Sequence, residues 1–199
     1  MLPDVELAEP VDALVGRLIL MHLADSVTVV KELTRCVRPG GLVTFQEINI
    51  SRARAIPDVP LVTTCREWIC AAQREAGSNP DMGEQLAQVL WSAGLARPEV
   101  AVAVSTGGAD SPAVSLIAET VRSLLPLIER GGAADARTED IDTLRGRLLA
   151  RVRAGAGDRL PVGAGRRVGA ARVVRGVRRM PSAGPTHRRP EYEAGPAHR

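Results

Sequence analysis

Aromatic side chains, lysine and long hydrophobic runs are the scarcest features of this 199-residue sequence. It contains one Phe, one Tyr and two Trp residues, and Lys31 is its single lysine. No apolar run approaches the roughly 20 residues that a transmembrane helix requires, so we expect no membrane-spanning segment. A content of 45% apolar and 25% charged residues is typical of a soluble globular protein.

Cysteine is also scarce, and the three residues present are an odd number. This argues against a disulfide framework and favours a reducing compartment. Cys65 and Cys70 lie five positions apart with no second pair or suitable histidine nearby, so we expect no metal site. The N-terminus is acidic and lacks the basic and apolar segments of a secretory signal, which predicts a cytoplasmic protein.

Charge divides the chain near residue 150. Residues 1–150 carry a net charge of −6, whereas residues 151–199 carry a net charge of +9 and consist mostly of Arg, Gly, Ala and Pro. Such a segment has few apolar side chains to bury, and its many positive charges repel one another. We therefore predict a folded domain over residues 1–150 and a largely disordered basic tail over residues 151–199.

Hydrophobic periodicity predicts an α/β fold for the first part of the chain. Asp25 or Ser26 can cap the first helix, which we expect to end at the Arg-Pro-Gly-Gly segment of residues 38–41. A strand, this helix and a second strand form a βαβ unit with parallel strands and a right-handed crossover. The expected strands are 11–16, 42–47 and 99–105, the expected later helices are 61–76, 82–93, 112–130 and one from Thr138, and no strand is expected after Ala150.

Residues 12–47 contain a series of short motifs at a specific spacing. They read DALVGR at 12–17, LMHLAD at 20–25, EL at 32–33, RPGG at 38–41 and FQE at 45–47. In this arrangement the chain resembles a class I S-adenosylmethionine-dependent methyltransferase, most closely the small-molecule branch of the ubiquinone and menaquinone biosynthesis type. A helix that ends in Ser-Ala-Gly-Leu and leads into the strand at 99–105 also fits this family.

The resemblance implies a partial Rossmann-like methyltransferase sheet, made of strands four to six of the family fold. The helices at 61–76 and 112–130 would form a lid over the acceptor pocket. We find no counterpart of the family's glycine-rich cofactor loop and acidic ribose-binding residue, which belong to strands one and two. The family also inserts a seventh, antiparallel strand between strands five and six. Since no strand is expected after Ala150, we expect unpaired sheet edges there.

The resemblance also implies S-adenosylmethionine as cofactor and a small-molecule methyl acceptor as partner. Arg17, Leu18 and His22 follow the first strand at the carboxyl edge, where open α/β sheets bind ligands, and are the expected cofactor-binding residues. Gln46 and Glu47 end the next strand and are the expected substrate-binding residues. His22 and Glu47 are also the candidates for a catalytic base.

Each of these residues also has a simpler structural interpretation. Arg17 can be a solvated surface residue and His22 can cap its loop, while Glu47 can pair with Arg52 or Arg54. Methyl transfer asks little of side chains beyond aligning the acceptor and excluding water. The sequence is therefore compatible with both the ligand-binding and the structural interpretation of these residues.

Three functions are compatible with the sequence. The first is an active methyltransferase, the second a non-catalytic fragment of one, and the third a nucleic-acid-binding protein that uses the basic tail. The tail holds one aromatic residue, Tyr192, and no lysine, which argues against nucleic acid. A Gly-x-Gly-x-x-x-Gly string at 163–169 follows no buried strand and is a chance match. Neither the acceptor nor the oligomeric state is indicated.

Overall fold

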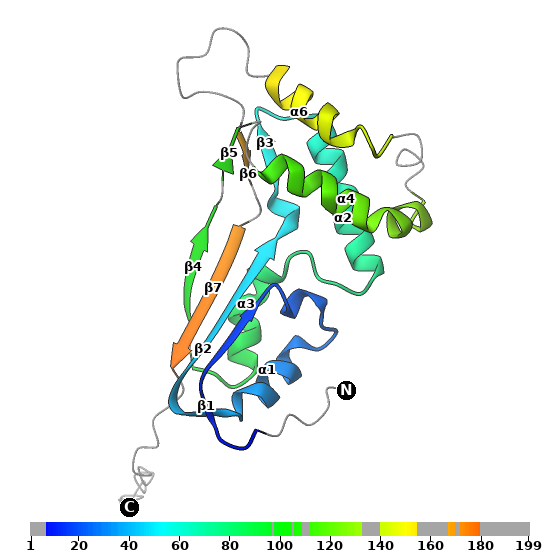
Figure 1. The fold of residues 1–199 in the computed structure, drawn as a ribbon. Helices are drawn as coiled ribbons and strands as arrows, with labels where there is room; N and C mark the ends of the chain where they lie inside the picture. The colour runs from blue at the N-terminus through cyan, green and yellow to red at the C-terminus, as the bar shows by residue number, and fades with distance from the viewer. Residues whose placement is uncertain are drawn as a thin grey trace, which may run out of the picture.

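The computed structural model describes residues 7–96, 98–104, 106–108, 112–132, 140–154, 167–169 and 172–179. They form an α/β fold with two sheets, in which long strands lie beside two groups of helices (Figure 1). The strands are β1 (Val11–Arg17), β2 (Val37–Asn49), β3 (Arg54–Ile56), β4 (Glu99–Ala103), β5 (Thr106–Gly107), β6 (Arg167–Gly169) and β7 (Arg172–Arg179). The helices are α1 (Ser26–Thr34), α2 (Pro60–Glu75), α3 (Met82–Ser92), α4 (Pro112–Arg130) and α6 (Leu144–Ala154), with short 3-10 turns η1 (Leu20–His22) and η2 (Ile50–Arg52).

The larger sheet has the order β1-β2-β7-β4. β1 and β2 are parallel and joined through α1, as the sequence predicts for a βαβ unit. β7 is antiparallel to β2 and to β4 and lies between them (Figure 1). The smaller sheet, β3-β6-β5, is antiparallel throughout.

The expectation that no strand follows Ala150 is wrong. β7 lies within the arginine-rich segment and pairs along its whole length with residues 42–49 of β2. It also pairs with β4, from Glu99 opposite Val177 to Ala103 opposite Val173. The expected gap beside β2 is therefore filled, because the backbone of a strand can satisfy both neighbours whatever its overall composition. Residues 167–169 and 172–179 are strands of the two sheets, and the rest of the predicted tail after Ala154 lies outside the described residues.

The segment Arg38–Gly41 belongs to β2 and does not end the preceding helix as expected. α1 ends at Thr34, and the amide of Val11 donates to the carbonyl of Cys36 at 2.8 Å, which starts the pairing of β1 with β2. The register then shifts between Val11 and Ala13, so the extra residues form a bulge. Gly40 supplies the positive φ of 77° that this bulge requires.

Two hydrophobic cores hold the helices in place. α1 and α3 pack on one face of the sheet, and Asp25 caps α1 as predicted by accepting from the amide of Thr28 at 2.9 Å. α2, α4 and α6 pack on one another in the second core, which lies beyond the carboxyl ends of β1 and β2 (Figure 1). α6 begins at Leu144, and the expected helix start at Thr138 lies outside the described residues. Ile50 packs against both cores and marks where they meet.

β1 is an edge strand in the part of the chain that the structure describes. Its inner side pairs with β2, and Val15 near its centre is 70% exposed. Over the same described ranges, no helix has the combination of length and hydropathy needed to cross a bilayer.

Candidate functional site

The carboxyl ends of β1 and β2 meet at one edge of the sheet because the two strands are parallel. Arg17, the last residue of β1, pairs with Gln46, and the amide of Leu18 donates to the Gln46 carbonyl at 2.8 Å. Leu18 has a φ of 50°, which is uncommon for a residue other than glycine and costs roughly 1–2 kcal/mol. This strained residue turns the chain from β1 into η1, which carries His22.

Glu47 lies beneath this turn and is fully buried. Its Oε1 accepts hydrogen bonds from the amides of Ile19 at 3.0 Å and Leu20 at 2.8 Å. Burial raises the pKa of the Glu47 carboxyl, and the amide hydrogen bonds only partly oppose this rise. Its Oε2 is buried without a hydrogen-bond partner. The carboxylate therefore holds the η1 turn from below and is buried in this structure, and its contact with a substrate stays a prediction.

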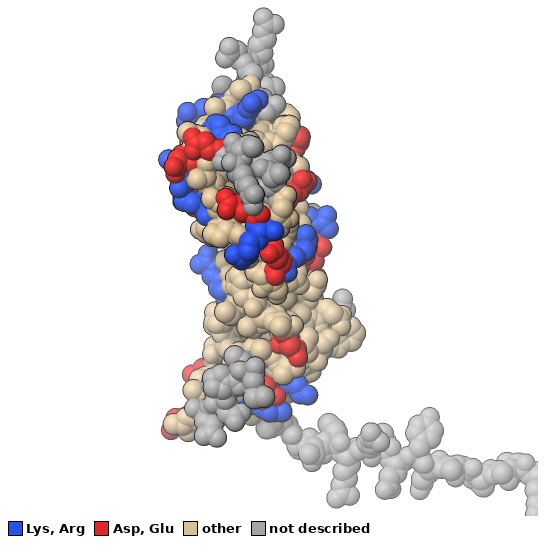
Figure 2. Space-filling view, turned by 90° about the vertical axis from the view of Figure 1, so that its right-hand side faces the viewer, with Lys and Arg blue, Asp and Glu red and all other residues tan. Residues whose placement is uncertain are grey.

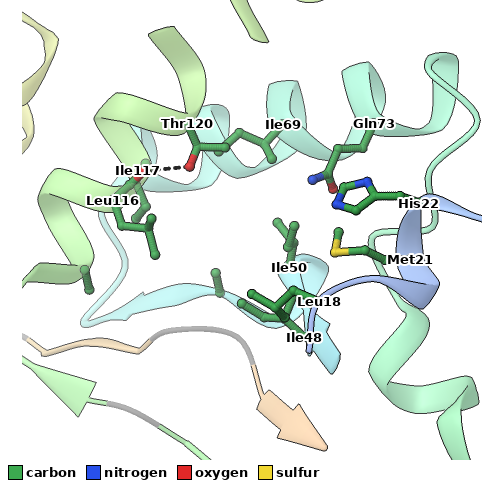
Figure 3. A pocket seen from close by; sticks show the side chains of 12 residues that line it. Leu18, Met21, His22, Ile48, Ile50, Ile69, Gln73, Leu116, Ile117 and Thr120 are labelled. Carbon is green, nitrogen blue, oxygen red and sulfur yellow. Dashed lines mark hydrogen bonds between the residues drawn. The ribbon is translucent and has the colours of Figure 1, made fainter. Parts of the chain in front are cut away.

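A pocket with a volume of about 240 Å³ opens between the sheet edge and the helices α2 and α4 (Figure 3). Its walls come from the end of β2 and the turns after β1 and β2 on one side, and from the two helices on the other. The lining residues are Leu18, Met21, His22, Ile48, Ile50, Ala53, Ile69, Gln73, Ala113, Leu116, Ile117 and Thr120. The pocket thus joins residues from four separate segments of the chain at the edge where the sequence predicts a site.

His22 lies at one end of the pocket, and its ring is held by the loop that follows α2. Its Nδ1 is 3.1 Å from the hydroxyl oxygen of Ser78, which leaves Nε2 as the ring nitrogen available to a ligand. The loop itself is tied to this turn, because the amide of Asn79 donates to the carbonyl of Met21 at 2.7 Å. The Ser78 hydroxyl therefore orients the exposed imidazole, and the hydrogen bond between Asn79 and Met21 holds the loop that carries Ser78.

Gln73 is the pocket residue that the sequence analysis missed. Figure 3 shows its amide beside the His22 ring, and only 9% of the residue is exposed. Its Oε1 is buried without a hydrogen-bond partner, which is uncommon for a buried polar atom. The sequence does hold a signal for Gln73. It lies four residues after Ile69, on the apolar face of an expected helix, and a polar residue on such a face indicates a buried polar site.

The expected site residues do not all come together. Leu18 and His22 line the pocket, whereas Arg17 and Gln46 do not. Successive side chains alternate across a strand, so the paired residues Arg17 and Gln46 lie on the sheet face opposite to Glu47. Arg17 is exposed and Gln46 is half-buried.

The sequence resemblance places S-adenosylmethionine at this edge of the sheet, next to Arg17, Leu18 and His22. The exposed Arg17 and the backbone turn at Leu18 stand at the strand end where such a ligand would lie, next to the pocket. Both carboxylate oxygens of Glu47 are buried beneath the turn, so neither is exposed to ribose hydroxyls. These residues can therefore contact a cofactor at this edge, but they do not enclose one.

The cysteines form no part of this site. Within the ranges that the structure describes, no three His, Cys, Asp or Glu side chains converge in a way that could hold a metal ion. Burial raises the pKa of the Cys65 thiol to about 11 and also raises that of Cys70. Both are buried, whereas Cys36 is half-buried.

We expect thiol labelling of the native protein at pH 8 to modify Cys36 and to leave Cys65 and Cys70 unmodified. A thiol with a pKa near 11 is ionised to only about 0.1% at this pH, and the thiolate is the reactive form. Iodoacetamide labelling followed by mass spectrometry measures this, with guanidinium-unfolded protein as the control in which all three cysteines react. Equal labelling of all three in the native protein would contradict the buried placement of Cys65.

No profile of a known protein family matches this chain, and no curated protein matches its sequence. Among solved structures, it is similar to phosphoethanolamine N-methyltransferase 2 of Haemonchus contortus in two complexes. One contains phosphomonomethylethanolamine and S-adenosylhomocysteine (TM-score 0.41, 15% identity), and the other S-adenosyl-L-methionine (TM-score 0.41, 14% identity). Both alignments cover 86% of this chain but only 34% and 33% of the enzyme, so the chain spans about a third of its length. The YcgJ protein of Bacillus subtilis is similar with a TM-score of 0.40 and 13% identity, over 88% of this chain and 68% of YcgJ.

Proposed function

We propose that this chain takes part in S-adenosylmethionine-dependent methyl transfer to a small-molecule acceptor. The observation that carries the proposal is the sheet order β1-β2-β7-β4 with an antiparallel β7. This is the order of strands four, five, seven and six in the methyltransferase family whose motifs residues 12–47 resemble. The antiparallel strand is an independent match, because none of those motifs lies within β7.

The pocket gives each part of the site a role in this reaction. In this proposal α2 and α4 form the lid that shapes the acceptor pocket and excludes water, Leu18 and His22 line that pocket, and Arg17 contacts the cofactor at the adjoining strand end. When bound, S-adenosylmethionine supplies a methyl group that is already activated, so the protein has mainly to align the acceptor. His22 can accept a proton from the acceptor through Nε2, and Glu47 acts as a positioning residue for the turn that holds His22.

Titration with S-adenosylhomocysteine tests this function. We expect saturable heat in calorimetry and a higher melting temperature, since ligand at 100 times its dissociation constant stabilises a protein by about 2.7 kcal/mol. Arg17→Ala is expected to weaken binding, whereas Arg35→Ala is a matched control because Arg35 is exposed just after α1 and pairs with Glu32. Absence of both heat and thermal shift for the intact chain would overturn the proposal.

Nucleic-acid binding by a free basic tail has less support. Four of the tail's arginines lie in β7, whose backbone is paired on both sides within the sheet. A strand in this position is not available as a flexible arm that follows a phosphate backbone. We therefore keep methyl transfer as the single proposed function.

A further inference from the structure

β4 forms one outer edge of the larger sheet, and β1 forms the other (Figure 1). β7 pairs with the inner side of β4, and no strand within the described ranges pairs with its outer side. Every residue of β4 is exposed, including Val100 at 46% and Val102 at 54%, and so is Val104, just after the strand, at 53%. The outer backbone groups of such an edge are a template to which another strand can add.

β4 lacks the features that usually keep an edge strand from pairing with another chain. The segment from Val100 to Val104 contains no charged residue, proline or glycine. β1, at the other edge, carries Asp12 and Arg17 and has a bulge after Val11. Because charges and bulges protect an edge strand, β4 is the edge that is open to a partner strand.

The valines of β4 lie on the face of the sheet that α3 covers. Val100 pairs with Gly176, and Gly176 also pairs with Phe45 of β2. Residues paired across strands share a face, and Phe45 is buried in the core that contains α1 and α3. Val102 shares this face because side chains alternate along a strand. α3 packs on β2 and β7, and it leaves both valines about half-exposed at the edge.

The sequence of this edge reads the same in both directions, since residues 100–104 are Val-Ala-Val-Ala-Val. Two copies that pair antiparallel about Val102 therefore place each valine opposite a valine and each alanine opposite an alanine. Val102 faces Val102 of the partner subunit, and Val100 faces Val104 of the partner subunit. Cross-strand pairs of β-branched residues stabilise a sheet, and a self-complementary contact of this kind is typical of a two-fold dimer. The strand thus fits a second copy of itself.

Glu99 is the one charged residue of β4, and it favours the antiparallel arrangement. In a parallel pairing in register, the two Glu99 side chains would lie on neighbouring strands about 5 Å apart and would repel each other. In the antiparallel pairing they lie at opposite ends of the contact, about 20 Å apart along the strands. This separation exceeds the screening length of about 8 Å at physiological ionic strength, so the repulsion between them is small.

The helix-covered side of the molecule differs from this edge. Figure 2 shows basic and acidic side chains interleaved above and below an uncharged band on that side. Charges of both signs therefore border any contact made there, whereas the segment from Val100 to Val104 carries none.

We propose that the protein forms a homodimer in which the β4 strands of two copies pair antiparallel about Val102 and join the two larger sheets into one. Since the paired strands run in opposite directions, the two pockets lie at opposite ends of the joined sheet and both stay open. The dimer is therefore independent of the proposed function. One short strand from each copy buries less than the roughly 1,600 Å² of a standard interface, so we expect a dissociation constant in the micromolar range.

Sedimentation velocity of the full chain at about 1 to 200 µM tests the dimer, because this range spans a micromolar dissociation constant. We expect the mass to rise from that of one chain to that of two and to stop there. A chain that stays monomeric over the whole range contradicts the proposal, and so does growth beyond two copies.

Val102→Lys tests the position of the two-fold axis. It places two lysines directly opposite each other, so we expect the dissociation constant to rise by about tenfold or more. The matched control is Val15→Lys on β1, the other edge strand, where Val15 is 70% exposed, and it is expected to leave the dimer unchanged. Both variants should melt like the unmodified chain because both side chains are largely exposed. Equal weakening by the two variants would mean that β4 is not the interface.

Mixing charge variants tests the antiparallel register itself. Val102→Glu alone is expected to weaken the dimer as Val102→Lys does, and an equimolar mixture of the two should associate more tightly than either alone, because Lys then faces Glu. A mixture that associates no better than its components would overturn the pairing about Val102. A chain that ends at residue 184 should dimerise like the full chain. Association that appears only after this truncation would mean that the chain's own last residues occupy the edge, and would equally overturn the proposal.

Discussion

A chain that ends at residue 154 is expected to lose cooperative unfolding. This truncation removes β7, which pairs with eight residues of β2 and five residues of β4. Without it the backbone groups of β2 and β4 lose their partners on the inner sides of the sheet, and β4 has no other strand to pair with in the described structure. Thermal unfolding followed by circular dichroism measures the loss as a broad or absent transition in place of a sigmoidal one.

A chain that ends at residue 184 is the control, because it keeps β7 and is expected to unfold like the full chain. A milder change in the same strand is Val174→Pro, which removes one backbone donor from a strand paired on both sides. We expect it to lower the free energy of unfolding by about 2 kcal/mol or more. If the chain ending at 154 unfolds with the same midpoint and sharpness as the chain ending at 184, the central position of β7 is wrong.

Replacing Glu47 by alanine is expected to be the most damaging single change near the site. It leaves the amides of Ile19 and Leu20 without their acceptor and opens a space in a fully buried position. Each unsatisfied buried amide costs about 1–3 kcal/mol, and relief from burying the carboxylate offsets part of this sum. We expect a net loss of about 2–4 kcal/mol in urea unfolding, together with weaker ligand binding because η1 carries His22. Glu32→Ala, at an exposed ion pair on α1, is the control and is expected to change stability by less than about 1 kcal/mol.

Glu47→Gln gives the complementary result through pH. The glutamine keeps an oxygen that can accept from both amides but cannot ionise. Since burial raises the pKa of Glu47 above its ordinary value of 4.5, the folded protein holds this proton to higher pH than the unfolded chain does. The stability that the protonated form contributes is present below pH 4.5 and is lost as the pH rises through the folded-state pKa.

The free energy of unfolding is therefore expected to fall relative to that of Glu47→Gln over this pH range. Urea titrations of both proteins at several pH values measure the difference. A difference that does not change with pH would mean that Glu47 is not buried as the structure places it.

Local sequence signals were sufficient to predict where a helix begins or ends when neighbouring residues determine that end. Asp25 begins α1 because its side chain caps the helix, and Gly94 closes α3 with a positive φ of 91° that glycine readily adopts. The parallel pairing of the first two strands also follows from the short helix between them. The location of the pocket at the carboxyl edge, with Leu18 and His22 lining it, follows from the same argument.

The features that the sequence did not reveal depend on partners far along the chain. β7 contains four arginines in eight residues, and nothing in its own composition indicates that β2 and β4 lie on its two sides. The bulge at Gly40 depends on which residues of β1 face β2. Gln73 could not be assigned to a pocket until α2 was placed beside the turn that carries His22.

The order of the strands also governs how this protein can assemble as it is synthesised. β2 and β4 precede β7 in the chain. Asn49 of β2 pairs with Arg172, and Ala103 of β4 pairs with Val173, so both partners are synthesised well before β7. Until β7 emerges from the ribosome, the nascent chain holds two strands whose inner edges have no partner, the form of backbone most prone to pair with other chains. Completion of the sheet is therefore a late and non-local step, because both partners of β7 are synthesised long before β7 itself.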